Sequence, residues 1–385
     1  MIIPRLQDNA GSAGCGDRHL PSFFPVEDAS FSLFDGRPVL FSEATQKLYE
    51  LNEIAAYIWC RLSVRMSVSR ICQDLENNGL KPADAQNFVQ DALRNWLKLG
   101  LLGVDWRSSE SHSFSTSVGD LQIRIRTSSG RVLDLLTSLF DRQTVANDGT
   151  DEVYDVIDVE GMVHLFHDQT YELQCSIDQL VPRLKAHITE RIILQSPPNV
   201  AFHAAGLLTD GKGMLVSGAP GAGKSTLALH LMSAGFDYGS DDVVLIAPDG
   251  RAAGVPFAPT VKSGAWSIIR SLRADIDMAP VHMRPDGKSV RYLKSPSSRP
   301  PGRFPVRWIV FIQRMPDASV KLLPLNRLEV MSRLIDGSYT PGGKLNRQAF
   351  DAFKRMVTVA QSFELQYSDA AQATGVLAQL CHDEP

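Results

Sequence analysis

The sequence lacks a long apolar run, a paired cysteine motif and a secretory signal pattern. A membrane-spanning helix needs about 20 consecutive apolar residues, and no segment approaches that length. The N-terminus has no basic segment followed by an apolar one, so we expect no signal peptide, a cytoplasmic location and no membrane partner. The five cysteines are scattered and odd in number, so we expect free thiols rather than disulfide bonds or a zinc site.

The chain also lacks a strong excess of charge of one sign. Its 39 basic and 43 acidic residues give a formal net charge of -4. Nucleic acid and anionic lipid attract proteins with an excess of Lys and Arg, so no nucleic-acid partner is expected. What the chain does have is the composition of a globular protein, with 44% hydrophobic residues in 385. That length allows two or three domains.

The N-terminal part is predicted to be an arm followed by a small domain. Residues 1–28 are rich in Gly, Pro and polar residues without an apolar period, which predicts a flexible arm. Asp35-Gly36 between two apolar segments predicts a β-hairpin. Three helices are predicted next, two capped by Asn52 and Ser67 and a third over residues 85–97. Strands around three helices give a winged-helix-like outline.

A Ser-rich stretch separates this part from the rest of the chain. Residues 107–119 are predicted to form a linker, which places a domain boundary near residue 110. The pattern beyond it predicts strands at 121–125 and within 153–166, and a helix over 175–193 that Pro182 should break or kink. Residues 120–385 would then form a second, larger domain.

One motif in the second domain points to phosphate binding. An apolar strand is predicted before it at 214–216, and a helix after it that ends at Gly235. Backbone N–H groups of such a loop face the phosphates of ATP, Lys224 adds a positive charge, and Ser225 is the expected Mg²⁺ ligand. The match to the Walker A pattern comprises Gly218, Ala219, Pro220, Gly221, Ala222, Gly223, Lys224, Ser225 and Thr226.

An acidic pair and a histidine accompany this motif. Asp241 and Asp242 directly precede the apolar segment 243–246. One carboxylate at such a place can hold Mg²⁺ while the other accepts a proton from a substrate hydroxyl, although a solvated turn is the simpler alternative. His203 lies among apolar residues before the loop, where a structural histidine is the commoner role. Its spacing leaves that role open.

With His203, the loop, Gly235 and Asp241-Asp242 in this order, residues 200–250 resemble the catalytic domain of HPr kinase/phosphorylase. The resemblance implies transfer of a phosphoryl group from ATP to a serine or threonine hydroxyl, with Mg²⁺. It implies an α/β fold of the HPr kinase/phosphoenolpyruvate carboxykinase type. It also implies that Asp241 is the acid/base residue, that Asp242 helps to hold metal and substrate, and that His203 lies near the acceptor.

The sequence departs from the bifunctional members of that family in two places. Thr226 stands where they have Glu, and residues 254–262 contain no acidic residue where they have a Glu-containing glycine-rich signature. A reverse phosphorylase reaction and one metal ligand are therefore not implied. This segment is similar to kinase-only relatives whose proline-rich strand ends in Lys, here Lys262. Lys262 and Arg291 are candidate contacts for phosphate or substrate, with surface ion pairing as the alternative.

The N-terminal domain has a resemblance of its own. Through Phe34-Asp35-Gly36, residues 49–53, Ile58-Trp59 and residues 97–102, the segment 30–105 resembles the PqqD-like peptide chaperones. Such domains hold the leader of a ribosomally made precursor peptide by adding it as a strand to a sheet edge. The resemblance implies a peptide-binding domain over residues 29–106, and a precursor peptide or small protein as acceptor.

Three functions remain open. The first is a serine kinase whose peptide substrate is held by the N-terminal domain. The second is a nucleotide-gated peptide-binding protein without phosphoryl transfer. The third is a transcription factor with an ATP-sensing domain, which the nearly balanced charge of the third predicted helix disfavours. The sequence does not identify the acceptor, and it leaves open whether the chain forms a homo-oligomer.

Overall fold

The chain contains two compact units. The computed structural model describes residues 21–106, 112–118, 121–140, 152–196, 199–294, 302–340 and 343–383. Of these, the first unit takes residues 21–106, 157–165 and 171–174, and the second unit takes the others. Among the described residues, none of the helices is both long enough and apolar enough to cross a bilayer.

The first unit carries the predicted hairpin and helices. Strands β2 (Ala29–Phe34) and β3 (Arg37–Ser42) pair antiparallel, and Asp35 and Gly36 between them have positive φ, which confirms the hairpin. Strand β4 (Lys47–Glu50) follows, then α1 (Glu53–Ser63), α2 (Val68–Asn77) and α3 (Pro82–Lys98). Asn52 and Ser67 accept the expected capping hydrogen bonds. The rings of Trp59 and Trp96 meet edge to face in the core.

The end of the predicted arm forms a strand. Residues 1–20 lie outside the described residues, but β1 (Ser22–Pro25) pairs antiparallel with β5 (Leu102–Asp105). The reason is burial, because Phe23 is enclosed in the core. A polar, Gly-rich stretch therefore ends in an apolar strand that the composition of the whole segment conceals.

A five-stranded sheet has the order β10-β9-β8-β7-β6. Its strands are β6 (Ser113–Val118), β7 (Leu121–Thr127), β8 (Glu152–Val159), β9 (Met162–His167) and β10 (Thr170–Ser176). Helix α4 (Gly130–Thr137) follows β7 in the chain. Strand β6 occupies part of the predicted linker, because its serines alternate with Thr116 and Val118, which are buried.

The helix predicted over 175–193 begins later than expected. Strand β10 continues to Ser176, and α5 spans Leu180–Gln195. Pro182 lies in the first turn of α5, where a backbone N–H has no intrahelical acceptor, so it neither breaks nor kinks the helix.

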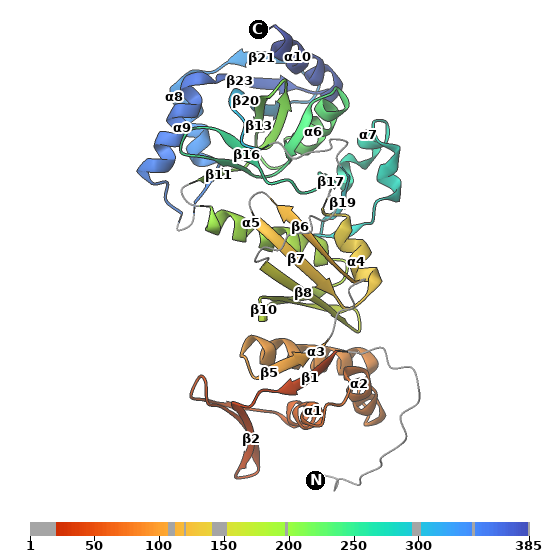
Figure 1. Ribbon diagram of the computed structural model, residues 1–385. Helices are drawn as coiled ribbons and strands as arrows, with labels where there is room; N and C mark the ends of the chain where they lie inside the picture. The colour runs from red at the N-terminus through yellow and green to blue at the C-terminus, as the bar shows by residue number, and fades with distance from the viewer. Residues whose placement is uncertain are drawn as a thin grey trace. The chain divides into compact units, whose positions relative to one another are not determined.

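The second unit is built on a six-stranded sheet of order β14-β12-β13-β20-β23-β21, of which Figure 1 labels β13, β20, β23 and β21. Its strands are β12 (Ala205–Thr209), β13 (Lys212–Ser217), β14 (Asp237–Ser240), β20 (Val306–Arg314), β21 (Lys321–Pro324) and β23 (Gln361–Tyr367). Strands β13, β20 and β23 run parallel, so their carboxyl ends share one edge. The phosphate-loop motif leaves β13 at this edge and enters α6 (Lys224–Ser233), as predicted.

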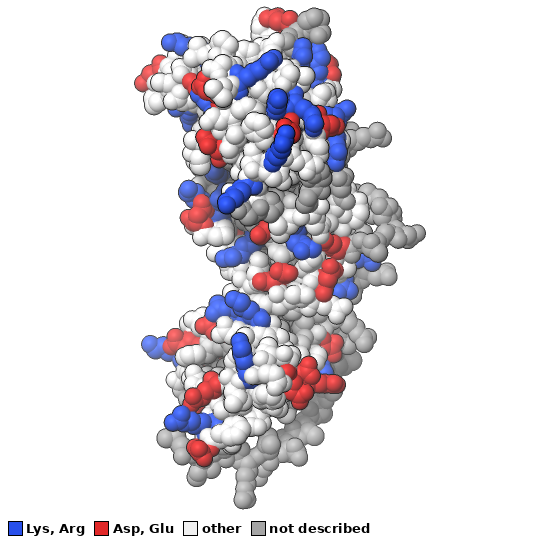
Figure 2. Space-filling view, turned by 90° about the vertical axis from the view of Figure 1, so that its left-hand side faces the viewer, with Lys and Arg blue, Asp and Glu red and all other residues white. Residues whose placement is uncertain are grey.

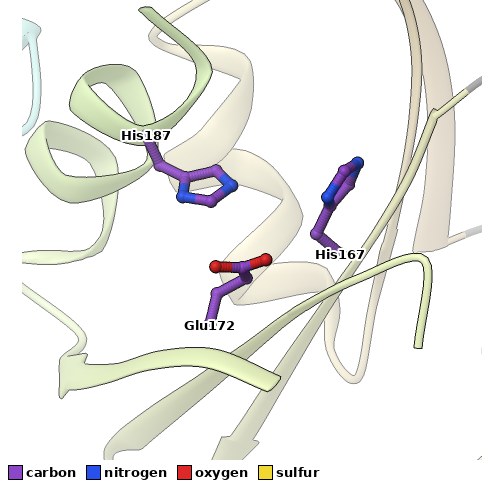
Figure 3. A group of neighbouring side chains, drawn as sticks. All are labelled: His167, Glu172 and His187. Carbon is purple, nitrogen blue, oxygen red and sulfur yellow. The ribbon is translucent and has the colours of Figure 1, made fainter. Parts of the chain in front are cut away.

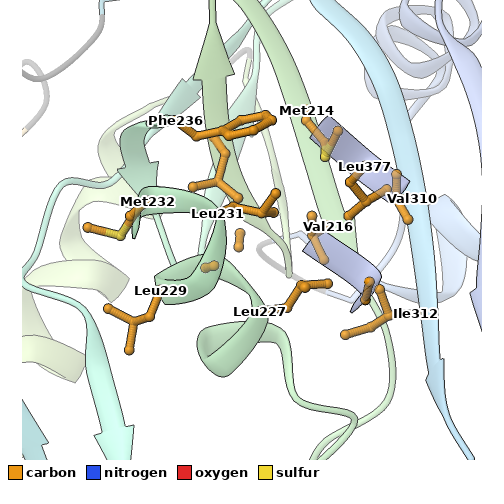
Figure 4. Packing of buried hydrophobic residues seen from close by; sticks show 14 of the residues in the cluster. Met214, Val216, Leu227, Leu229, Leu231, Met232, Phe236, Val310, Ile312 and Leu377 are labelled. Atoms are coloured by element: carbon orange, nitrogen blue, oxygen red, sulfur yellow. The ribbon is translucent and has the colours of Figure 1, made fainter. Parts of the chain in front are cut away.

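Helices cover both faces of this sheet (Figure 1). Met214 and Val216 of β13 pack with α6 and with α10 (Ala370–His382) on one face, as Figure 4 shows. Leu215 lies in the core on the other face, with α8 (Arg327–Asp336) and α9 (Arg347–Val359). This period of two along a buried strand produces a mixed α/β architecture, as the sequence predicts.

Two smaller sheets complete the second unit. One has the order β16-β15-β11-β22, formed by β11 (Val200–Phe202), β15 (Val244–Ile246), β16 (Ala252–Gly254) and β22 (Ser338–Tyr339). The other has the order β17-β19-β18, formed by β17 (Thr260–Lys262), β18 (His282–Met283) and β19 (Ser289–Tyr292). Helix α7 (Trp266–Arg270) and two short 3₁₀ segments, Ser263–Ala265 and Ala274–Met278, lie between β17 and β18 in the chain.

Glycines let β12, β14 and β16 approach one another closely. A Cβ atom at Gly254 would lie 2.3 Å from the carbonyl oxygen of Gly239, and one at Gly239 would lie 2.9 Å from that of Gly206. Both clashes are with backbone, which cannot move aside as a flexible side chain can. Side chains at these positions would push β14, which leads into the acidic pair, away from β12 and β16.

Replacing Gly254 by alanine should therefore destabilise the second unit. We expect Gly254→Ala to lower the free energy of unfolding by about 1–3 kcal/mol, as overpacking does, in a chemical denaturation experiment. Gly375→Ala is the matched control, because Gly375 is exposed within α10 and an added Cβ would meet nothing within 4 Å. There alanine should raise stability by about 0.5–1 kcal/mol. Equal effects of the two changes would contradict this packing argument.

Candidate functional site

The phosphate-loop motif forms a tight turn that only glycine can make at three positions. Gly221 and Gly223 have φ of 88° and 97°, in the left-handed region. At Gly218 a Cβ atom would lie 2.7 Å from the carbonyl oxygen of Ile312, on the neighbouring strand. The hydroxyl of Tyr367, at the end of β23, donates to the carbonyl of Ala222 at 2.9 Å. The loop is thus anchored to two neighbouring strands.

Lys224 begins helix α6 and folds back over the loop. Its side chain is buried, and Nζ donates to the carbonyl oxygen of Gly218 at 2.7 Å. Burial lowers the pKa of Lys224 below its ordinary value, Lys262 lowers it further, and Asp242 and Asp241 act in the opposite direction. The ammonium therefore lies within the loop, and both carboxylates raise its pKa.

Asp241 is a buried carboxylate whose two oxygens are held by the protein. Only 4% of the residue is exposed. Oδ2 accepts a hydrogen bond from the backbone N–H of Thr260 at 2.8 Å. Oδ1 lies 3.2 Å from the hydroxyl of Tyr238, which also lies 2.8 Å from the carbonyl of Phe257 and can donate to one of them at a time. Asp241 thus connects the end of β14 to β17.

Asp242, in contrast, is open to solvent. Its side chain is 52% exposed. The Nδ1 atom of His203 lies 2.9 Å from its carbonyl oxygen and 3.3 Å from its Oδ1. Burial of part of the carboxyl raises its pKa, but the charges of Lys185, His203, Arg284 and Lys224 outweigh this and hold the pKa below its usual range. Asp242 is therefore kept ionised.

Lys185 is a residue of the site that sequence reasoning missed. It lies on α5 and is 8% exposed. Its Nζ donates to Thr260 Oγ1 at 2.8 Å and lies 3.6 Å from Asp241 Oδ1 and 3.8 Å from Asp242 Oδ2. Burial lowers its pKa, but the two carboxylates outweigh that and raise it above the ordinary value. No local motif marks this lysine, because its partners lie more than 50 positions along the chain.

The two other predicted contacts lie in different places. Lys262 is the last residue of β17 and is exposed, and its positive charge lowers the pKa of Lys224. Arg291 packs its guanidinium 4.4 Å over the ring of Trp266 and pairs with Asp277. The charge of Lys262 thus acts on Lys224, whereas Arg291 is held by an ion pair and a cation–π contact. Arg284, which was not predicted, acts on Asp242.

The residues present fit a nucleotide and a divalent cation. At Gly221, which has a φ of 88°, an added Cβ atom would meet nothing within 4 Å, so the loop backbone is open there to a phosphate. Ser225 lies in the first turn of α6, partly accessible, and Asp242 offers an ionised and accessible carboxylate. Hydroxyl and carboxylate oxygens are the donors that Mg²⁺ prefers.

A separate histidine pair lies outside this site. His167 of β9 and His187 of α5 have ring centroids 6.0 Å apart and are labelled in Figure 3. The ring of Tyr154 stacks on that of His167, and Nε2 of His167 lies 3.0 Å from Glu152 Oε2. Arg191 and Gln195 also contact Glu152. The two histidines thus belong to a packed polar cluster in which Glu152 is already paired.

The first unit has a groove of about 320 Å³ beside the edge strand β4. Tyr49 and Glu50 of β4 form one wall, and most of the other lining residues come from α1 and α3, among them Ile58, Phe88 and Ala92. Strand β4 pairs only with β3 in its three-stranded sheet, so its other side is an edge. An apolar groove beside a strand edge suits an extended peptide.

Comparisons with known proteins find one matching family model and a number of similar solved structures. Residues 38–102 match the family described as "Coenzyme PQQ synthesis protein D (PqqD)". A search of the curated proteins finds no match. The solved Hpr(Ser) kinase/phosphatase from Coxiella burnetii is similar over 48% of this chain and 88% of its own, at 12% identity and a TM-score of 0.23. The first unit is thus similar to PqqD over most of its length.

Proposed function

We propose that this protein is an ATP-dependent kinase that phosphorylates a serine or threonine hydroxyl of a peptide or small protein. The observation that carries the proposal is that a half-exposed carboxylate, Asp242, contacts His203, whose carbonyl accepts a hydrogen bond from Ser217, the residue directly before the phosphate loop. A protein that only binds a nucleotide needs only the loop, whereas phosphoryl transfer also needs a group that orients the attacking oxygen, in a kinase the acceptor hydroxyl. His203 beside Asp242 adds a second polar group that an acceptor can reach.

The residues around the loop can perform this transfer by positioning and by charge compensation. The acceptor oxygen would bond to the γ-phosphorus while the bond from phosphorus to ADP breaks, and the hydroxyl proton would pass to a carboxylate. Mg²⁺ held by Ser225 and by one oxygen of Asp242 would neutralise phosphate charge, which would leave the other oxygen of Asp242 for the acceptor proton. Lys224 would exchange its bond to the Gly218 carbonyl for one to a phosphate oxygen. This is a P-loop kinase site of the HPr kinase type.

The two carboxylates differ in what they can reach. Both oxygens of Asp241 face donors of the protein, so it can accept the hydroxyl proton only if Tyr238 turns to Phe257. Asp242 needs no such change, because its side chain is accessible. We therefore extend the acid/base role to the pair, with Asp242 as the member that meets the acceptor.

The acceptor that we propose is a precursor peptide whose leader occupies the groove beside β4. Residues 38–102 match PqqD, and the groove offers a strand edge together with apolar side chains of α3. DNA binding is a weaker reading of the same helices. Basic and acidic side chains are interspersed on the face drawn in Figure 2, whereas a surface that binds phosphates along DNA is basic.

Loss of the loop lysine should remove both nucleotide binding and transfer. We expect Lys224→Ala to weaken ATP binding at least about tenfold, because a buried charge next to the phosphates is lost, as measured by calorimetry. Label transfer from γ-labelled ATP to peptides encoded beside its gene should fall in parallel. Lys321→Ala, an exposed lysine of β21, is the control and should change neither.

Neutralising the exposed carboxylate should separate chemistry from binding. Asp242→Asn should lower the rate of label transfer by about 10²–10⁴-fold, the usual contribution of acid–base catalysis, while ATP still binds. If label never leaves ATP for any peptide, while Lys224→Ala still abolishes peptide capture, the kinase proposal fails. That outcome would favour a nucleotide-gated peptide-binding protein.

Blocking the groove should remove peptide binding alone. Ala92 lines the groove from α3, so Ala92→Arg would fill it and add a charge. We expect at least about tenfold weaker binding of a fluorescent precursor peptide in an anisotropy titration, with ATP affinity unchanged. Asn77→Arg, at the exposed end of α2, adds the same side chain outside the groove and should have no effect. Equal losses for both variants would count against this groove.

A further inference from the structure

Lys185 reaches the candidate site from an element that does not belong to the nucleotide-binding sheet. It lies on α5, whereas the loop and the acidic pair lie next to strands β13, β14 and β15. Its ammonium donates to the hydroxyl of Thr260 at 2.8 Å, and the backbone N–H of Thr260 donates to Asp241. The lysine and the carboxylate are therefore held by one residue.

The surroundings of Lys185 show that its charge is compensated in place. Asp241 and Asp242 lie 3.6 Å and 3.8 Å from its Nζ. The rings of Phe257 and Tyr292 lie within 6 Å of the ammonium, at 5.9 Å and 5.8 Å. A buried ammonium is tolerated where anions and ring faces offset its lost hydration. Lys185 thus stays charged without depending on a bound ligand.

Charge at this edge of the sheet has to be balanced before a nucleotide can bind. Two adjacent carboxylates repel each other, and a triphosphate adds several negative charges beside them. Lys224 lies in the loop and is available to the phosphates, so it cannot also neutralise the acidic pair. Lys185 is anchored by Thr260 within 4 Å of both carboxylates. It can offset one carboxylate while leaving the loop free.

We propose that Lys185 is a positioning residue of the nucleotide site, which offsets the charge of Asp241 and Asp242 so that the pair and a triphosphate share one edge. This inference rests on the proposed function, because it takes the phosphate loop as the nucleotide site. Lys185 lies outside the phosphate-loop motif, and a residue that served only packing would not make affinity depend on the number of phosphates. The loss of affinity must grow with the number of phosphates on the nucleotide.

The test compares ATP, ADP and AMP binding to the full chain by calorimetry with Mg²⁺. Lys185→Met keeps the length of the side chain and removes its charge. We expect ATP affinity to fall at least about tenfold, ADP affinity less, and AMP affinity by less than twofold. Lys288→Met, which removes an exposed lysine paired with Asp286, should change none of them.

Removing one carboxylate should restore the balance. The double variant Lys185→Met/Asp241→Asn has the same charge around the pair as the unaltered chain, so its ATP affinity should return to within about threefold of it. Asp241→Asn alone should bind ATP more tightly than both the double variant and the unaltered chain. This order can be measured even if Lys185→Met does not fold. A double variant that binds ATP as tightly as Asp241→Asn alone would overturn the proposal.

Two further outcomes separate the inference from the function on which it rests. Equal losses for ATP, ADP and AMP would show a packing role for Lys185 and overturn the inference, whether or not transfer occurs. The expected order of affinities without any label transfer would refute the kinase and leave the inference standing. Absence of ATP binding by the unaltered chain would overturn both.

Discussion

The hydrogen bond from the backbone N–H of Thr260 to Asp241 is the contact on which the candidate site depends. It joins the first residue of β17 to the turn after β14, although β17 belongs to a different sheet. Because the hydroxyl of Thr260 also holds Lys185, this one residue fixes a carboxylate and its counter-ion together. Lys262, two residues later on β17, is exposed, and its charge lowers the pKa of Lys224.

The phosphate loop depends on a second constraint, the parallel alignment of β13, β20 and β23. Their carboxyl ends share an edge, so Ile312 and Tyr367 flank the loop from neighbouring strands. Burial raises the pKa of Tyr367 to about 12, so its hydroxyl stays protonated and can donate to the Ala222 carbonyl. The loop is therefore shaped by its neighbours before any nucleotide is present, which lowers the ordering cost of binding.

Local patterns in the sequence were sufficient for most of the secondary structure. The hairpin at Asp35-Gly36, the caps Asn52 and Ser67, and the strand and helix around the loop depend on neighbours within a few residues, and the structure confirms them. Strand β6 was missed because its burial comes from pairing with β7 and not from its own composition. The start of α5 was misplaced because a proline pattern alone does not show which turn it occupies.

The candidate site likewise contains residues that the sequence identifies and residues that only the fold brings together. The loop, Asp241-Asp242 and His203 were found because they form a contiguous motif or lie near one, and their roles stay predictions. Lys185, Tyr238 and Thr260 carry no signal of their own. Lys185 and Thr260 meet across 75 positions, and only the fold establishes that contact. A lysine on an amphipathic helix is usually a surface residue, so no rule of composition would have selected it.

Asp241 and Asp242 are adjacent in the chain but have different surroundings in the structure. Neighbouring carboxylates at one sheet edge would ordinarily compete for the same protons and cations. Here the backbone and Tyr238 occupy Asp241, Lys185 lies between the two, and Asp242 alone keeps an accessible oxygen. The buried member therefore holds the counter-ion, and the exposed member is free to meet a ligand. A motif of two identical residues thus gives two different groups, and the difference comes from α5 and β17, which the motif does not contain.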